Sequence, residues 1–293
     1  MILHRIKRKL IRIFFREQWS LLVCDLDGNV LMHILPPKDG IWADPFPIDY
    51  NNKTYIFAEE QIGHGNGTLG VIELTKDMCH SPFTHVLKKE YHLSFPNVFP
   101  LMDSDQTIWY MVPETHENNT IDLYRSSNFP YDWQLETTLM KNVDASDSIV
   151  YYQDPFWYLF TSIGTKEIPK NSNLSLFYSR TFPSTEWIPH PQNPICDDPA
   201  NSRMAGALFI DRDSNMLCRP SQNCFGDYGK ETNINKILEL SPLKYSEELL
   251  YTIKPESSLK GVGTHTFNHS KYYILRDIKT KNFRKIKEIS LKN

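Results

Sequence analysis

Short runs of hydrophobic and aromatic residues alternate with polar turn clusters along most of this chain. Between about residues 19 and 278 the runs are rich in Tyr, Phe, Trp, Ile and Val, and clusters such as DYNNK (49–53) and GHGNG (63–67) separate them. Runs bounded in this way are typical of β-strands. Beyond the first twenty residues, only residues 244–253 offer a short candidate helix. The pattern therefore predicts an all-β fold.

The strand pattern repeats about every 50 residues. A β-propeller blade is a four-stranded sheet that buries its faces on its neighbours, so this period favours a propeller over a stack of sandwich strands. Each repeat contains a short segment and, 10 to 15 residues later, an aromatic or aliphatic strand. Five copies predict five blades. The paired segments are 42–46 and 55–57, 95–99 and 110–112, 146–150 and 158–160, 204–209 and 217–219, and 263–267 and 273–275.

The last repeat runs out of chain after about two strands. A hairpin-like segment at 18–35, centred on Asp27-Gly28-Asn29, can supply the missing outer strands. We therefore expect N-terminal strands to pair with the final repeat near residues 272–275, which removes the open edge of the last blade. The predicted organisation is a basic amphipathic helix at 1–17, a five-bladed propeller at 18–278 and a Lys-rich tail at 279–293.

The predicted N-terminal helix has one apolar face. Ile6, Leu10, Ile13 and Phe14 share this face, and basic residues fill its flanks and far side. Two interpretations stay open. Residues 1–16 either make peripheral contact with an anionic membrane or pack against the body of the protein.

Composition narrows the classes of partner. Of the 293 residues, 40% are hydrophobic, which is enough for a large core. The 32 basic and 35 acidic residues give a net charge of −3, so a nucleic-acid partner is not expected. No apolar run reaches the roughly 18–20 residues of a membrane span, and the first residues do not resemble a secretory signal. We expect a cytoplasmic protein, at the inner face of the membrane if the helix binds lipid.

The five cysteines form no CxxC pair and no metal-ligand spacing with histidine. We expect them to be reduced and structural. The sequence predicts no metal site and no other cofactor.

Two rings of polar residues are predicted around the propeller axis, because the first strand of each blade lines the central channel. Rings of mixed charge are hard to explain by packing alone, since unpaired buried charges are costly. The first ring contains Asp44, Asn97, Asp147, Arg203 and His265. The second contains Glu59 or Glu60, Glu114, Arg219, Gln222, Arg276 and Asp277.

The segment WADPF, the following YIFAEE and the second aspartate of DASDSIV resemble the five-bladed propellers of glycoside hydrolase family 43. This resemblance implies that Asp44 acts as base or nucleophile and that Asp147 tunes an acid. A closer resemblance extends over about residues 18–278. The series WADPF, SFPNVF, YMVPET, DSIV, HPQNP, RMAGALF, RPSQNC and GTHTFN is similar to the N-terminal propeller domain of plant glucosamine inositolphosphorylceramide transferases. It implies a carbohydrate-active protein whose partners are a sugar donor and a glycan or lipid-linked acceptor.

One departure from family 43 affects the expected chemistry. Those hydrolases carry a general-acid glutamate on the fourth blade, where this chain reads SRMAG at 202–206. An ordinary glycoside needs an acid to protonate its leaving group. A phosphate leaving group needs positive charge instead, which Arg and His side chains supply. The cations available are Arg203, Arg219, Lys260 and His265.

The sequence therefore favours glycosyl transfer from a phosphorylated donor, in surface or lipid-linked glycan assembly. A family 43-like glycosidase is the alternative, with Glu59, Glu60 or Glu114 as its acid. A propeller that only binds glycan or protein is a third hypothesis. The expected substrate-binding residues are Trp42, Asn97, Glu60, Arg203, Arg219, Gln222, Tyr228 and His265.

Several of these residues also have purely structural interpretations. Asp44 is followed by proline, as in many turns, and Asp147 can bind loop amides. Arg203 and Arg219 can form structural ion pairs, and His265 can be a satisfied core histidine. The aromatic residues that can stack on a sugar, or fill the space between blades, are Trp42, Phe46, Trp109 and Tyr228.

Overall fold

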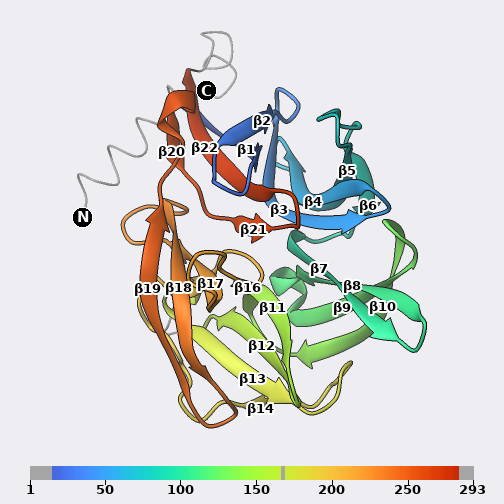
Figure 1. Cartoon of the computed structure of the whole chain (residues 1–293), viewed down its shortest axis with the longest axis vertical. Helices are drawn as coiled ribbons and strands as arrows, with labels where there is room; N and C mark the ends of the chain where they lie inside the picture. Colours follow the sequence, from blue (N-terminus) through green and yellow to red (C-terminus); the bar gives the residue numbers. More distant parts are fainter. Residues whose placement is uncertain (1–14, 166–168, 284–293) are drawn as a thin grey trace.

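Five antiparallel sheets surround one axis in the computed structural model, which describes residues 15–165 and 169–283 (Figure 1). The prediction of an all-β, five-bladed propeller is confirmed. The first blade consists of β3 (Gly40–Tyr50), β4 (Lys53–Ile62), β5 (Thr68–Leu74) and β6 (Thr84–Leu87). The second consists of β7 (Ser94–Asp103), β8 (Gln106–Glu114), β9 (Thr120–Asn128) and β10 (Tyr131–Lys141).

The third blade is built from β11 (Ala145–Gln153), β12 (Phe156–Ile163), β13 (Leu174–Ser179) and β14 (Ile188–Pro189). The fourth contains β15 (Arg203–Met204), β16 (Phe209–Ile210), β17 (Leu217–Asn223), β18 (Glu231–Leu240) and β19 (Tyr245–Ile253). The fifth contains β20 (Gly261–Gly263), β21 (Phe267–His269), β22 (Ile274–Phe283), β1 (Phe15–Cys24) and β2 (Val30–Ile34). Three 3₁₀ turns complete the described elements: η1 (His116–Asn118), η2 (Lys170–Ser172) and η3 (Ser257–Leu259).

The aromatic and aliphatic repeats identified in the sequence form the second strand of every blade. These strands are buried on both faces because each blade packs between two others. In β4, for example, Ile56 and Phe57 are both fully buried, and they belong to two different hydrophobic clusters on opposite faces of the sheet. The stacked apolar faces therefore hold the ring of blades together.

Both ends of the described chain lie in the fifth blade. β1 pairs antiparallel with β22, from Phe15 opposite Phe283 to Cys24 opposite Ile274. β1 then turns into β2 through the loop around Gly28, as the hairpin pattern indicated. Residues 15–17 and 279–283 are strand, so the strands extend beyond the predicted domain limits. Each of these two segments completes the hydrogen-bond ladder of the other.

Two expectations for helices have different outcomes. The candidate helix at 244–253 is wrong, because this segment is strand β19 and its backbone groups pair with β18. The predicted basic helix falls almost wholly on residues 1–14, which lie outside the described residues. Within the described part of the chain, no helix has the length and apolar character needed to cross a bilayer.

A β-bulge recurs in the innermost strands of the first three blades. The register shifts between Ala43 and Phe46, and it shifts at the corresponding place in β7 and in β11. Each bulge contains a residue with positive φ: Asp44 at 54°, Phe95 at 47° and Asp147 at 52°. Left-handed backbone is uncommon for residues other than glycine, and bulges often redirect a side chain next to a functional site. Two of the three bulges thus present an aspartate.

Candidate functional site

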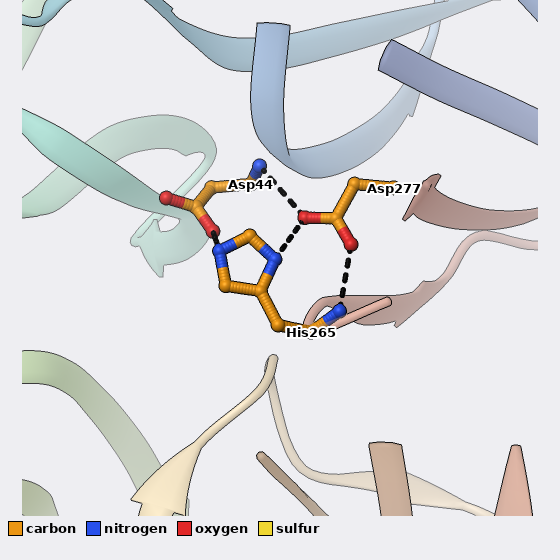
Figure 2. A group of neighbouring side chains, drawn as sticks. All are labelled: Asp44, His265 and Asp277. Atoms are coloured by element: carbon orange, nitrogen blue, oxygen red, sulfur yellow. Dashed lines mark hydrogen bonds and ion pairs between the residues drawn. The ribbon is translucent and has the colours of Figure 1, made fainter. Parts of the chain in front are cut away.

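Asp44, His265 and Asp277 form a chain of ion pairs at the axis of the propeller (Figure 2). His265 lies between the two carboxylates, with Nδ1 2.5 Å from Asp277 Oδ2 and Nε2 3.5 Å from Asp44 Oδ1. All three side chains are buried. Burial opposes the charge on His265, but Asp277 and Asp44 outweigh it and raise the pKa of the imidazole.

Asp277 orients this histidine. Its Oδ1 accepts the backbone N–H groups of His265 and Thr266, at 2.8 and 3.1 Å. Burial opposes ionisation, but the His265 charge and these hydrogen bonds lower the pKa of Asp277. Asp277 is therefore the ionised partner that holds the ring in place.

Asp44 is held by a different set of donors. The Thr266 hydroxyl donates to Oδ1 at 2.8 Å, and the Phe95 N–H donates to Oδ2 at 3.2 Å. Burial raises the pKa of Asp44, with the His265 charge acting in the opposite direction. A base whose pKa is closer to neutrality is better matched to proton transfer near pH 7.

The Asp44, His265 and Asp277 group is also close enough to be considered as a metal site, since one donor atom from each lies within 4.8 Å of the others. However, both oxygens of each aspartate already take part in hydrogen bonds or in contact with His265. Both ring nitrogens of His265 face a carboxylate. The donor set therefore fits a hydrogen-bonded relay better than a metal ion.

Glu114 and Asp147 share one arginine. Arg203 Nε donates to Asp147 Oδ2 at 2.6 Å, and its Nη2 lies 3.6 Å from Glu114 Oε2. Glu114 also has His116 Nδ1 at 2.8 Å, while Gln222 Nε2 donates to Asp147 at 2.9 Å. The predicted ring residues of blades two, three and four are thus brought together in one network.

The two carboxylates of this network have opposite pKa shifts. Burial opposes ionisation of Glu114, but the His116 hydrogen bond and the Arg203 charge lower its pKa to about 2. Burial raises the pKa of Asp147 to about 7, with Arg203 opposing the shift and Glu114 adding to it. Since one arginine serves both groups, the second ionisation is opposed by the first.

Glu59 is the carboxyl group of this site with the weakest polar contacts. It is buried, and its Oε1 lies 3.3 Å from Nε2 of His92. His92 accepts the Gly67 N–H at Nδ1, so its hydrogen is on Nε2, and burial lowers its pKa. Burial and the charges of Asp44 and Glu114 raise the pKa of Glu59 well above its usual value. These surroundings therefore favour the protonated form of the Glu59 carboxyl group.

Aromatic rings line one side of the relay. Trp19 lies over His265 with ring centroids 4.1 Å apart, and Tyr228 meets the same imidazole edge-on at 5.2 Å. Gly229 has φ of 62°, and a Cβ there would lie 2.7 Å from the Trp19 ring, so only glycine allows this approach. Tyr228 is 41% exposed and nearby Phe225 is 68% exposed. Both can reach a ligand from solvent.

Asn97 is buried, and its Nδ2 has no hydrogen-bond partner within the described residues. An amide in this state is a donor that a bound ligand can use.

Three predicted substrate-binding residues do not belong to this site. Trp42 and Glu60 are cross-strand partners, and the Trp42 indole donates to Glu60 at 3.0 Å. Trp42 also stacks on Phe83, and Glu60 binds His85. They lie on the face of the sheet opposite Glu59, because side chains alternate along β4.

Arg219 is the third correction. It is fully buried and pairs with Glu247, through Nε at 2.7 Å and Nη2 at 2.5 Å. Arg219 is therefore a structural ion pair within blade four. The aromatic residues Phe46 and Trp109 are core residues, packed against Phe95 and Phe129. Arg276 also lies outside the network and contacts Cys24.

His92 and His116 were missed by the sequence reasoning. His92 immediately precedes the β7 repeat, and His116 follows Glu114 by two residues. A histidine beside a predicted ring residue was the available signal. Trp19 and Thr266 gave no comparable signal, because only the blade packing brings them to the axis.

The fold and the centre define a five-bladed β-propeller with a cluster of buried carboxyl groups at its axis. Solved structures of glycoside hydrolases share this fold. The catalytic domain of a Coprinopsis cinerea family 62 alpha-L-arabinofuranosidase covers 92% of this chain and 98% of its own length, with a TM-score of 0.59 and 13% identity. A family 117 glycoside hydrolase from Zobellia galactanivorans covers 96% and 98%, with a TM-score of 0.57 and 9% identity. At these identities the likeness concerns the fold alone.

Residues 36–285 match the family described as glucosamine inositolphosphorylceramide transferase 1, N-terminal. The protein of that name from Oryza sativa subsp. japonica is 34% identical over 230 residues, and the one from Arabidopsis thaliana is 32% identical over 238. These alignments cover 75% and 77% of this chain. The chain belongs to this family, as its motifs indicated. It spans about 30% of the length of these relatives.

Proposed function

We propose that the central site binds a carbohydrate and catalyses transfer of a glycosyl group by acid–base chemistry, with Glu59 as acid and Asp44 as base. One observation carries the proposal. Two of the buried carboxyl groups in the site have different partners: Asp44 is supported by three donors, whereas Glu59 faces a neutral histidine. Pairs of acids whose environments differ in this way define acid and base roles in many enzymes.

The proposed reaction balances without a cofactor. Glu59 donates its proton to the oxygen that leaves the anomeric carbon, and that carbon–oxygen bond breaks. Asp44 removes a proton from water or from an acceptor hydroxyl, whose oxygen forms the new bond. Asn97 and Tyr228 offer a hydrogen-bond donor and an aromatic surface to the sugar.

Transfer from a phosphorylated donor is the second candidate, supported by the names of the relatives. The charges favour it less, because Arg203 already contacts Asp147 and Glu114, and Arg219 is paired with Glu247. His265 is likewise held between two carboxylates. A phosphate would meet more negative than positive charge at the axis. A lipid-linked or surface glycan as acceptor belongs to this candidate, and a propeller that only binds glycan is the third.

The deciding experiment measures turnover of aryl glycosides, sugar phosphates and nucleotide sugars by the wild type and by Asp44→Asn. General acid–base catalysis contributes about 10²–10⁴-fold, so we expect Asp44→Asn to lower kcat by that factor with little change in substrate affinity. Glu248→Gln, which alters an exposed ion pair, is the control. Unchanged turnover in Asp44→Asn would remove the base assignment. Activity restricted to phosphorylated donors would favour the second candidate.

We also propose that the β1–β22 pairing closes the propeller ring. The pairing of ten residues on each strand supports this role. Removing residues 15–35 should abolish cooperative unfolding measured by circular dichroism. A folded truncated protein would contradict the proposal.

A further proposal concerns the basic and apolar pattern of the first residues, which lie outside the described part. We propose that they bind the cytoplasmic face of an anionic membrane. Anionic vesicles should retain the intact protein at low salt, and retention should fall at high salt or after deletion of residues 1–14. Equal retention of both forms would contradict this.

A further inference from the structure

A cavity of about 670 Å³ lies between the fourth and fifth blades, away from the central network. It is bounded by β19, β21, the β1–β2 turn and the loop between β16 and β17, in blades that are neighbours in Figure 1. Its volume is typical of small-molecule sites. Most of its wall is apolar and consists of Leu26, Leu250, Tyr251, Ile253, Phe267 and Ile274.

Arg276 brings a buried positive charge to this cavity. The residue is 8% exposed, and its Nε has no hydrogen-bond partner among the described residues. Nη2 donates to Cys24 Sγ at 3.5 Å, and burial raises the pKa of that thiol above 9.0, so it stays neutral. Within residues 15–165 and 169–283, no carboxylate lies within 4.0 Å of the guanidinium nitrogens. The nearby Glu256 carboxylate instead accepts from the Ser258 N–H and hydroxyl.

The fourth blade contains a counterpart of Arg276 that is fully neutralised. Gln222 and Lys279 occupy equivalent positions, because each pairs with the innermost strand of its blade. Arg219 and Arg276 each lie three residues before these positions. Arg219 has both oxygens of Glu247 and the Asn201 carbonyl as partners. A buried charge without such partners is costly. The difference in partners between the two arginines indicates that the charge of Arg276 pairs with a bound ligand.

The other charges of the cavity are already satisfied by the protein. At the mouth, Arg212 binds Asp27 at 2.7 Å and Asp213 at 3.5 Å. Asp211 accepts hydrogen bonds from Ser214, through both the backbone N–H and the hydroxyl, and from the Tyr251 hydroxyl. Among the residues that the structure describes, Arg276 is therefore the cation of this cavity that has no carboxylate partner.

We propose that this cavity binds an amphiphilic anion, with its carboxylate or phosphate head on Arg276 and its aliphatic chain against Leu250, Ile253 and Phe267. Guanidinium binds both head groups in a bidentate manner. The apolar wall excludes water from the chain. This site is separate from the glycosyl site, because Arg276 and Asp277 are consecutive on β22 and point to opposite faces of the sheet.

Calorimetric titration of the wild-type protein tests the proposal, with decanoate, decyl phosphate, decanol, acetate and inorganic phosphate as probes below micelle-forming concentrations. At least one long-chain anion should bind ten times more tightly than decanol, and acetate and phosphate should not bind measurably. The stronger of decanoate and decyl phosphate identifies the head group. Equal affinity for decanol, binding of the short anions alone, or no binding would overturn the proposal.

The variant Arg276→Gln should weaken binding of the long-chain anion at least tenfold and leave decanol binding unchanged. Arg212→Gln is the matched control, because that side chain is at the mouth and 57% exposed, and it should change affinity less than threefold. Equal losses in both variants, or none in Arg276→Gln, would overturn the proposal.

A second variant covers the case in which Arg276→Gln does not fold. Leu250→Glu places a negative charge on the cavity wall at a position 37% exposed to solvent, so the fold should tolerate it. It should weaken binding of the long-chain anion at least tenfold. Unchanged affinity in a folded Leu250→Glu protein would contradict the assigned cavity.

Discussion

Glu59 and Glu114 occupy equivalent positions in the first two blades, yet their carboxyl groups have opposite pKa shifts. Glu59 pairs with Ala43 and Glu114 with Ser94, in each case immediately before the bulge of the inner strand. Their exposed fractions are 6% and 7%. Burial therefore opposes ionisation of both to a similar degree.

The difference comes from the neighbouring cations. Glu114 faces Arg203 and His116. The interaction with Glu114 raises the pKa of His116. Glu59 faces His92, which burial keeps neutral, and it receives the repulsion of Asp44 and Glu114. Equivalent backbone positions thus hold one carboxyl group with a lowered pKa and one with a raised pKa, and the side chains around each set the direction of the shift.

The largest expected effect concerns catalysis. Glu59→Gln should lower kcat/KM about 10²–10⁴-fold for glycosides with poor leaving groups, because the proton donor is lost. A dinitrophenyl glycoside leaves without protonation, so its turnover should be nearly normal. Steady-state kinetics on the two substrate types measures this. A uniform loss on both would remove the acid assignment of Glu59.

Folding stability should show the opposite ranking of the two residues. Glu114→Gln removes the carboxylate that faces Arg203 and His116, and breaking a buried ion pair costs about 3–5 kcal/mol. Glu59→Gln replaces a protonated acid by a neutral amide of similar shape and should change the free energy of unfolding by less than about 1 kcal/mol. Urea unfolding at pH 7 compares them. Equal losses would contradict the assigned protonation states.

The pH dependence of stability should differ in sign. The folded pKa of Glu114 is about 2, below its ordinary 4.5, so its stabilising contribution is complete above 4.5 and is lost as pH falls toward 2. The folded pKa of Glu59 is raised, so its contribution is lost as pH rises above 4.5. Unfolding free energies across this range should be flatter on the acid side in Glu114→Gln and flatter above 4.5 in Glu59→Gln. Parallel profiles would contradict the comparison.

The smallest effect concerns the two histidines. His116→Asn removes an ion pair with Glu114 and, after allowing for the partial exposure of His116, should cost about 1 kcal/mol. His92→Asn disrupts contacts between neutral groups and should cost about half as much. Thermal unfolding of both variants at pH 7 measures the difference. A larger loss in His92→Asn would reverse the assignment of charged and neutral partners.

Only some of the predicted site residues lie in the central network, for a reason that lies in strand geometry. Asp44, Glu59, Glu114, Asp147, Arg203, Gln222 and His265 take part in the central network. Glu60 and Trp42 do not, because neighbouring positions on a strand point to opposite faces. A run such as YIFAEE leaves open which of its two glutamates faces the axis.

The sequence alone predicted the all-β class and the five repeats, because alternating hydrophobic runs and turn residues act over a few positions. Its series of short motifs indicated the family. Only the tertiary structure decided protonation and pairing. Arg219 found Glu247 within its own blade, whereas Arg276 lacks such an acid in the described residues. His92, in a loop, and His116, at the start of η1, contact different glutamates. These outcomes depend on distances between segments far apart in sequence, and charge interactions in a buried site follow those distances.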